Sequence, residues 1–337
     1  MNLYNIFNTI LLITNLIDGL KIFMSNKLKL NDLKRFSLLS KVIYDYDYKN
    51  VHKHYNKNNY IFDINKNNLE NITTDFTQKN NIYFNVNQFI TSLDNKDFIK
   101  NTEKYLLLLN NFFPNINFYS YFYDKKKIFL FILLNHVDKE IIVIFKGSQY
   151  RDEWIQNLKI KEKVIDFNEK KYKIHSGMYD MYRDDNIDTN IIYILKNLFN
   201  YFPKYRKIFT GHSKGTINNI LLSFELTTKL DKKYNYEIFN FGTPPLFNYD
   251  FGMYLHNHSN IFINNVMNDL DIITLLPLNK YHVGLEILLK NNNITIKKHK
   301  TPYKIENKIT FNNLIESIKN HDLHAYIKKI FENKINY

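Results

Sequence analysis

The sequence predicts an α/β fold with a mostly parallel central sheet and helices on both faces. Two observations support this prediction. From about residue 116 onward, short apolar runs alternate with longer amphipathic segments, as strands alternate with helices around a parallel sheet. The pentapeptide Gly211–Gly215 also stands between one such apolar run and a segment of helical length. With 337 residues, 45% of them hydrophobic, the chain can form one large domain after an N-terminal extension.

The first part of the chain divides into three segments. Residues 1–17 are apolar but lack a basic start and a small-residue cleavage site. They fit a weak signal peptide, a membrane anchor or an ordinary apolar helix. The compartment is therefore left open between soluble, peripheral membrane and secreted. We treat residues 1–28 as a separate segment and 29–337 as one domain. Apolar residues at helical spacing predict an amphipathic helix from Leu30 to Tyr48, whereas residues 49–103 are rich in Asn and Lys and predict long loops.

The strands and helices of the main domain are expected in a regular succession. Three apolar runs separated by charged turns predict strands at 117–123, 128–134 and 141–145. Helical segments follow near 151–160 and 178–200. A strand at 207–210 leads into a helix at 216–230, and two further strands are predicted at 236–242 and 260–268.

Composition excludes several kinds of chemistry. The chain has no cysteine, so disulfides, thiolate metal sites and a cysteine nucleophile are excluded. Its histidines and carboxylates show no metal-ligand spacing, and we predict neither a metal nor a cofactor. The formal net charge is +13, which favours anionic partners. The Lys excess is spread along a chain rich in Lys, Asn, Ile and Tyr, as in AT-rich coding sequences, and it identifies no partner alone.

The strongest local motif is Gly-His-Ser-Lys-Gly at 211–215. It has the form G-x-S-x-G between a predicted strand and a predicted helix. In this context a serine stands on a tight turn, with its hydroxyl raised above the sheet and the helix N-terminus near a developing oxyanion. Ser213 is therefore the candidate nucleophile. The alternative is that Ser213 only caps the helix.

Several ordered blocks resemble the class 3 lipases, the fungal triacylglycerol lipase family. The resemblance covers about residues 116–327. Six of the eight glycines lie near these blocks, at positions 147, 177, 211, 215, 242 and 284. The blocks are IIVIFKGSQYRDEWIQNL at 141–158, HSGMY at 175–179, TGHSKG at 210–215, FGTP at 241–244 and DIITLLP at 271–277.

The resemblance implies the α/β-hydrolase fold and a Ser-acid-His triad in that chain order. Two acids follow a strand, Asp269 and Asp271, and the family's acid aligns with Asp271. Of two C-terminal histidines, His321 fits the family pattern H-D-L-x-x-Y better than His324 does, so we expect His321 to be the base. His175 and His212 are expected to be structural histidines of their blocks.

The resemblance also implies an oxyanion hole and a lid. The amide of Lys214 and a donor at Ser148 are the expected oxyanion hole. Residues 149–163 are the expected lid, whose apolar positions include Trp154, Ile155 and Leu158. A plain surface helix would show the same amphipathic pattern.

The chain departs from the family pattern at three positions. Lys214 replaces the usual Leu, Thr216 a Gly, and Asn157 an acid of the lid. These changes bear on substrate preference more than on the chemistry. The expected function is hydrolysis of lipid carboxylic esters at an interface, with peripheral contact to a membrane or lipid droplet and no nucleic-acid partner. Alternatives are a phospholipase A1, a galactolipase, a soluble-ester esterase, or an inactive basic membrane- or nucleic-acid-binding protein on this fold.

Overall fold

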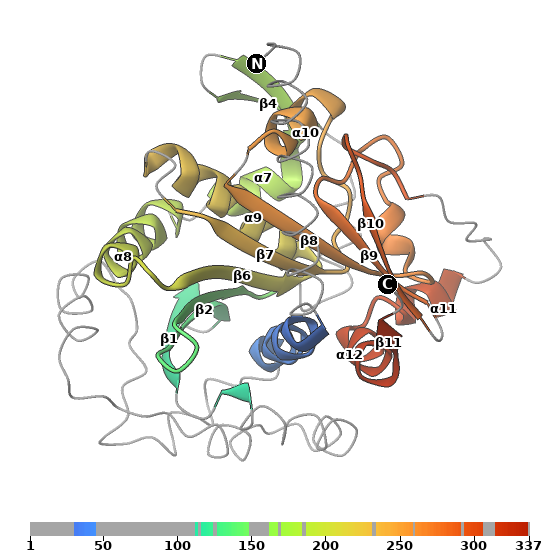
Figure 1. Cartoon of the computed structure of the whole chain (residues 1–337). Coiled ribbons are helices and arrows are strands. Elements are labelled where there is room, and N and C mark those ends of the chain that lie inside the picture. Colours follow the sequence, from blue (N-terminus) through green and yellow to red (C-terminus); the bar gives the residue numbers. More distant parts are fainter. Residues whose placement is uncertain are drawn as a thin grey trace, which may run out of the picture.

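A nine-stranded sheet forms the centre of the described structure (Figure 1). The computed structural model describes residues 30–44, 112–113, 116–123, 127–147, 162–167, 170–183, 187–230, 234–258, 260–290, 293–305 and 314–335. The predicted N-terminal segment 1–28 and the predicted loops at 49–103 lie outside these ranges. Of the predicted lid, only residues 162 and 163 are described, and both belong to a strand.

Parallel pairing dominates the middle of the sheet. Strand β3 pairs in parallel with β6, and β6, β7, β8 and β9 continue in parallel order. Antiparallel pairs β1–β2 and β2–β3 lie on one side and β9–β10 on the other, with β11 parallel to β10 at the edge. The strands are β1 (Ile116–Tyr123), β2 (Lys127–Asn135), β3 (Glu140–Phe145), β6 (Arg206–His212), β7 (Tyr236–Phe241), β8 (Ile261–Asn268), β9 (Leu285–Leu289), β10 (Asn293–Lys298) and β11 (Lys334–Ile335).

Helices cover both faces of this sheet (Figure 1). The helix of residues 30–44, blue in Figure 1, and α12 lie on one face, and α8 and α9 lie on the other. A separate hairpin is formed by β4 (Glu162–Phe167) and β5 (Lys170–His175). The remaining elements are α7 (Ser176–Arg183), α8 (Ile187–Tyr201), α9 (Lys214–Lys229), α10 (Tyr249–His256), the 3-10 helix η1 (Ile272–Leu275), α11 (Leu314–Lys319) and α12 (Leu323–Glu332).

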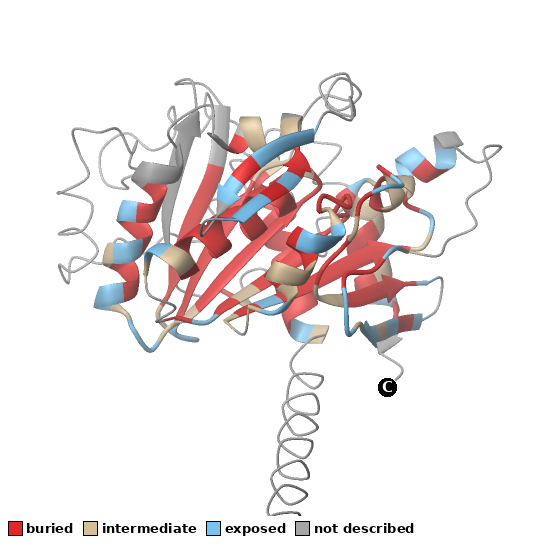
Figure 2. Cartoon of the chain, turned by 90° about the horizontal axis from the view of Figure 1, so that it is seen from above, coloured by how far each residue is buried: buried red, intermediate tan, exposed pale blue. Residues whose placement is uncertain are grey.

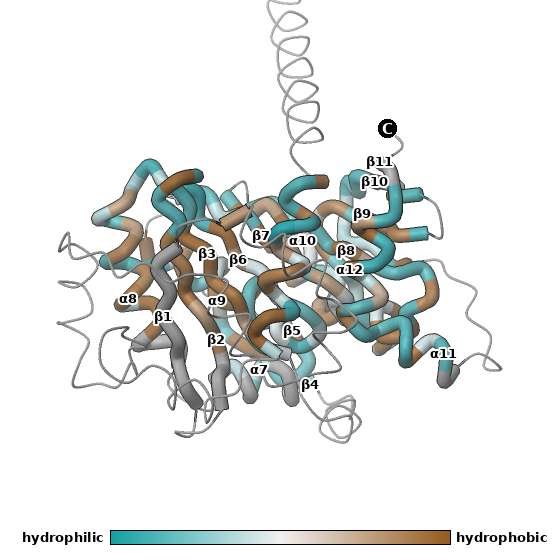
Figure 3. The backbone as a smooth tube through the Cα atoms, turned by 90° about the horizontal axis from the view of Figure 1, so that it is seen from below, coloured by the Kyte–Doolittle hydropathy of each residue, from teal (hydrophilic) through white to brown (hydrophobic). Residues whose placement is uncertain are grey.

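The core is divided by the sheet into two hydrophobic layers. Ile141 and Val143 of β3 join the layer under α8 and α9, whereas Ile142 and Ile144 join the layer under the helix of residues 30–44 and α12. Alternation of side chains along a strand produces this division. The central strands are buried on both faces (Figure 2), and hydrophobic residues follow β3 and β6 (Figure 3). In the sequence, strands buried on both faces appear as continuous apolar runs.

The predicted architecture, a mostly parallel central sheet with helices on both faces, is confirmed, with one change in the helices. The segment predicted as a single helix near 178–200 forms two, α7 and α8. The helix expected near 151–160 lies outside the described residues. Within the described part of the chain, no helix has the length and apolar character needed to cross a membrane.

Candidate active site

Ser213 lies between the end of β6 and the start of α9, at the carboxyl edge of the parallel strands. Its backbone has φ 56° and ψ −126°, a conformation that non-glycine residues rarely adopt. Strain of this kind persists where the surrounding structure enforces it, and it is characteristic of a nucleophile elbow. The Ser213 side chain makes no capping hydrogen bond to α9. The alternative of a serine that only caps the helix is therefore not supported.

Close packing around the turn explains the glycine at 215. A Cβ added at Gly215 would overlap the carbonyl oxygen of Phe145, the last residue of β3. A Cβ at Gly211 would lie 2.9 Å from the same oxygen. The two flanking positions of the motif must therefore stay small for α9 to approach the sheet beside Ser213.

Three side chains distant in sequence form one hydrogen-bonded chain at this edge. Ser213 Oγ is 2.9 Å from Nε2 of His321, and Nδ1 of His321 is 2.7 Å from Oδ2 of Asp271. Asp271 is fully buried, while His321 retains 15% of its side-chain exposure. The carboxylate can only accept, so the geometry places a proton on Nδ1 and leaves Nε2 to accept the proton of the serine hydroxyl.

The carboxylate of Asp271 is held by two further donors. The Ile273 amide donates to Oδ1 over 2.8 Å, because Asp271 is the cap of η1. The Tyr326 hydroxyl donates to Oδ2 over 2.5 Å. The rival acid, Asp269, instead accepts from the Lys329 ammonium over 2.6 Å. The structure thus places Asp271, and not Asp269, against the histidine.

The structure also separates the two C-terminal histidines. His321 precedes α12, and its ring packs against Gly242, which has φ +64° and where an added Cβ would lie 3.1 Å from His321 Cε1. His324 lies in the first turn of α12, where its amide donates to the capping carboxylate of Asp322 over 2.8 Å. Burial lowers the pKa of His324. Of the two rings, that of His321 faces Ser213.

Tyr326 is a functional candidate that the sequence analysis did not assign. It is the tyrosine of the pattern H-D-L-x-x-Y, so the signal was present, but the pattern alone did not say what its hydroxyl contacts. The side chain is fully buried. Burial, and then the adjacent Asp271 carboxylate, raise the pKa of Tyr326 well above its ordinary value, so the phenol stays protonated and donates.

His282 supports the loop that carries Asp271. Its Nε2 donates to the Thr274 carbonyl over 2.8 Å, and the Thr274 hydroxyl donates to the Asp271 carbonyl over 2.8 Å. The ring is also stacked on Tyr303. Burial lowers the pKa of His282 from its ordinary 6.5 to about 4, against the raising effect of the bond to Thr274. His282 is therefore neutral at ordinary pH.

The other residues singled out from the sequence fall into two groups. His175 and His212 are buried; the ring nitrogens of His175 have no hydrogen-bond partner in the described structure, and those of His212 contact Tyr44 and His321. Lys214 is the first residue of α9. Ser148, Trp154, Ile155 and Leu158 lie outside the described residues. Among the described residues, no group of three His, Asp or Glu side chains could hold a metal ion.

Comparison with known proteins identifies sequences that resemble this chain. Residues 142–281 match the family model of class 3 lipases. A lipase of Rhizomucor miehei is 24% identical over 160 residues, which are 46% of this chain and 43% of that lipase. The chain thus spans less than half the length of this curated relative. Ser213 and Asp271 lie inside the matched segment, whereas His321 and Tyr326 lie beyond it.

Solved structures show the same fold. A lipase from Rhizopus microsporus var. chinensis superposes with a TM-score of 0.52 and 22% identity, over 65% of this chain and 76% of that one. Lipase II from Rhizopus niveus gives a TM-score of 0.50 at 19% identity, over 63% and 81%. The resemblance to class 3 lipases and the α/β-hydrolase fold are both confirmed.

Proposed function

We propose that this chain, whose residues 142–281 resemble the class 3 lipases, is a serine ester hydrolase that acts on lipids. The observation that carries the proposal is the continuous hydrogen-bonded chain from Ser213 through His321 to Asp271. It is built on a strained elbow in an α/β-hydrolase fold. Such an arrangement activates a serine hydroxyl for attack on a carbonyl carbon.

In the proposed first step, Ser213 Oγ attacks the ester carbonyl while Nε2 of His321 takes the hydroxyl proton. Asp271 keeps the imidazole in the required tautomer and stabilises its protonated form, which needs a carboxylate fixed in place. The contacts of Asp271 with Ile273 and Tyr326 supply that fixation. The protonated His321 then gives its proton to the departing alcohol, which leaves an acyl group on Ser213.

In the second step, water gives a proton to His321 and attacks the acyl-enzyme, and the acid product leaves as Ser213 recovers its proton. A negative oxygen develops in both steps. We assign its stabilisation to the Lys214 amide at the start of α9 and to a donor at Ser148. The favourable field at a helix N-terminus supports the assignment of the Lys214 amide. The Lys214 side chain is not required, because the donor is the backbone N–H.

A lipid substrate is favoured by the family match and by the net charge. A positive protein is drawn to anionic lipid surfaces, and salt weakens that attraction. The phospholipase A1, galactolipase and soluble-ester esterase alternatives share the same chemistry and differ in the ester accepted. The inactive membrane- or nucleic-acid-binding alternative does not account for the three aligned side chains.

Hydrolysis of triacylglycerol and phospholipid emulsions and of a soluble short-chain ester tests the proposal directly. Ser213→Ala is the control, and we expect it to abolish hydrolysis while the circular dichroism spectrum stays unchanged. Residual activity above about a tenth of wild type would overturn the nucleophile, since losing a triad nucleophile costs far more. The order of rates on the three substrates separates lipase, phospholipase and esterase.

The interfacial part of the proposal has its own test. Trp154 is the only tryptophan and lies in the predicted lid segment, so its fluorescence reports on that segment alone. We expect emission to shift with vesicles, more strongly when they are anionic, because indole favours the boundary between apolar and polar phases. Unchanged emission together with simple saturation on soluble esters would favour an esterase.

A further inference from the structure

The helix of residues 30–44 lies outside the segment that matches the class 3 lipases, yet it contacts the catalytic turn. Its contacts with β6 follow one another in order: Asp32 with Arg206, Ser40 with Thr210 and Tyr44 with His212. The twelve steps from residue 32 to residue 44 rise about 18 Å in a helix, and the six steps from residue 206 to residue 212 rise about 20 Å in a strand. The helix therefore runs beside β6 over its whole length.

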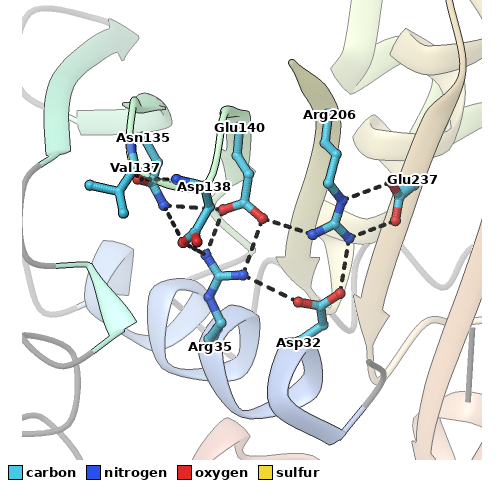
Figure 4. Close-up of polar contacts among 8 residues, drawn as sticks. All are labelled: Asp32, Arg35, Asn135, Val137, Asp138, Glu140, Arg206 and Glu237. Carbon is cyan, nitrogen blue, oxygen red and sulfur yellow. Dashed lines mark hydrogen bonds and ion pairs between the residues drawn. The ribbon is translucent and has the colours of Figure 1, made fainter. Parts of the chain in front are cut away.

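A partly buried ion cluster, with Asp32, Arg35 and Glu140 buried at its centre, fixes the first turns of this helix to the sheet (Figure 4). Arg35 contacts Asp32, Asp138 and Glu140, with 2.5 Å to Glu140 Oε2. Arg206 contacts Asp32, Glu140 and Glu237 within 2.9 Å. Burial raises the pKa of Glu140, although Arg35 opposes this. Removing one partner of such a cluster leaves a buried charge uncompensated, so the cluster resists any shift of the helix.

At the other end of the helix, the Tyr44 hydroxyl lies beside the two sequence blocks that carry the proposed oxyanion donors, at 210–215 and 141–158. It is 3.0 Å from Nδ1 of His212, the residue before the nucleophile. A Cβ added at Gly147 would overlap this hydroxyl, so it also packs directly against the residue before Ser148. On the opposite side of the His212 ring, Nε2 is 2.7 Å from the carbonyl oxygen of His321.

These contacts determine how the protons are placed. The His321 carbonyl can only accept, so Nε2 of His212 carries the proton and Nδ1 has a lone pair. Nδ1 then accepts from the Tyr44 hydroxyl. Burial, and then the neighbouring His321, lower the pKa of His212 well below its ordinary value, which agrees with a neutral ring that uses each nitrogen once. The rings of His212 and His321 lie 4.7 Å apart.

We infer that Tyr44 is a positioning residue that acts on the nucleophile and the base through His212. Its hydroxyl fixes the orientation of the His212 ring, and His212 in turn holds the backbone of His321 beside Ser213. The inference rests on the proposed function and adds the helix of residues 30–44 to the machinery. If the His212 ring were held by one contact instead of two, His321 could move. Proton transfer needs the 2.9 Å separation between His321 Nε2 and Ser213 Oγ, and that separation would then change.

Tyr44→Phe removes only the hydroxyl, and Tyr182→Phe is its matched control. Tyr182 is buried and, like Tyr44, makes a hydrogen bond through its hydroxyl, to Glu225 over 3.1 Å, but Glu225 lies about 18 Å along α9 from Ser213. We expect Tyr44→Phe to lower kcat on a soluble ester about tenfold with KM unchanged. We expect Tyr182→Phe to keep both constants while losing comparable thermal stability. Equal kcat in Tyr44→Phe and wild type would overturn the inference.

A double-mutant cycle tests the route through His212. The variant His212→Gln keeps an amide donor for the His321 carbonyl but removes the ring nitrogen that Tyr44 contacts. Adding Tyr44→Phe to His212→Gln should therefore cause no further loss of kcat, whereas independent effects would multiply. Multiplication would contradict a route through His212.

A spectroscopic test does not depend on turnover and so distinguishes failure of this inference from failure of the proposed function. The ¹⁵N shifts of labelled histidine report which ring nitrogen of His212 is protonated and whether the unprotonated nitrogen accepts a hydrogen bond. We expect Nε2 of His212 to be protonated in wild type, in Ser213→Ala and in Tyr44→Phe, because the His321 carbonyl fixes the tautomer. The shift of Nδ1 should change in Tyr44→Phe alone, because that nitrogen loses its hydrogen bond. An unchanged Nδ1 shift of His212 in Tyr44→Phe would overturn the inference even if the wild-type protein hydrolyses esters.

Discussion

Acid should destabilise the protein in part through His282, which supports the loop of the proposed catalytic acid. The native pKa of His282 is about 4 because the ring is buried, whereas an unfolded histidine titrates near its ordinary 6.5. Between these values the unfolded state binds more protons than the native state. The stabilisation from a neutral His282 is therefore complete above the unfolded pKa and is lost as pH falls toward the native one.

The magnitude follows from the two pKa values. Protonation of the unfolded state between about pH 7 and about pH 5 lowers the free energy of unfolding by about 2 kcal/mol for this one residue. His282→Gln keeps an N–H that can donate to the Thr274 carbonyl and removes the titrating ring. Urea unfolding followed by circular dichroism at both pH values should show the wild type losing about 2 kcal/mol more than the variant.

The comparison cancels the other titrating groups, because wild type and variant share them. Glu140 and His212, whose pKa values burial also shifts, contribute equally to both proteins. If His282→Gln lost as much stability as wild type over this range, His282 would not be neutral and buried in the native state. The account of the Asp271 loop would then be wrong.

Three further predictions concern the proposed triad and are measured as initial rates on a soluble ester. His321→Ala should abolish activity and His324→Ala should leave it nearly intact, since only the first ring faces the nucleophile; the reverse ranking would move the base. Asp271→Asn should lower kcat by roughly 10⁴, and Asp269→Asn should have a small effect; a critical Asp269 would contradict the contacts of Asp271. Tyr326→Phe should lower kcat about tenfold, because a charge-assisted hydrogen bond is lost; unchanged kcat would make Tyr326 purely structural.

The sheet and the elbow could be predicted because their requirements are local. Strands β3 and β6 are buried on both faces and so appear as apolar runs. The glycines at 211 and 215 follow from the approach of α9 to the end of β3. The hairpin β4–β5 was not predicted, because lysines and acids occupy half of its strand positions and its strands bury few side chains.

The contacts between distant segments could not be derived from local patterns. Local patterns did not distinguish Asp269 from Asp271 as the acid, and only the resemblance to class 3 lipases favoured Asp271. In the structure the two carboxylates differ in their contacts, because Asp271 caps η1 and Asp269 contacts Lys329. Tyr44 carried no functional signal in the sequence, because its proposed role depends on the packing of one helix beside a strand more than 160 residues later. Such contacts are a property of the assembled fold.

The central claim is that Ser213 is an activated nucleophile, and mass spectrometry of the protein treated with a fluorophosphonate tests it most directly. The reagent forms a stable covalent bond with an activated serine. The account predicts one adduct per chain, mapped to the peptide that contains Ser213, and none in Ser213→Ala or in urea-unfolded protein. The absence of an adduct on the folded wild type, or an adduct that persists in Ser213→Ala, would contradict the account.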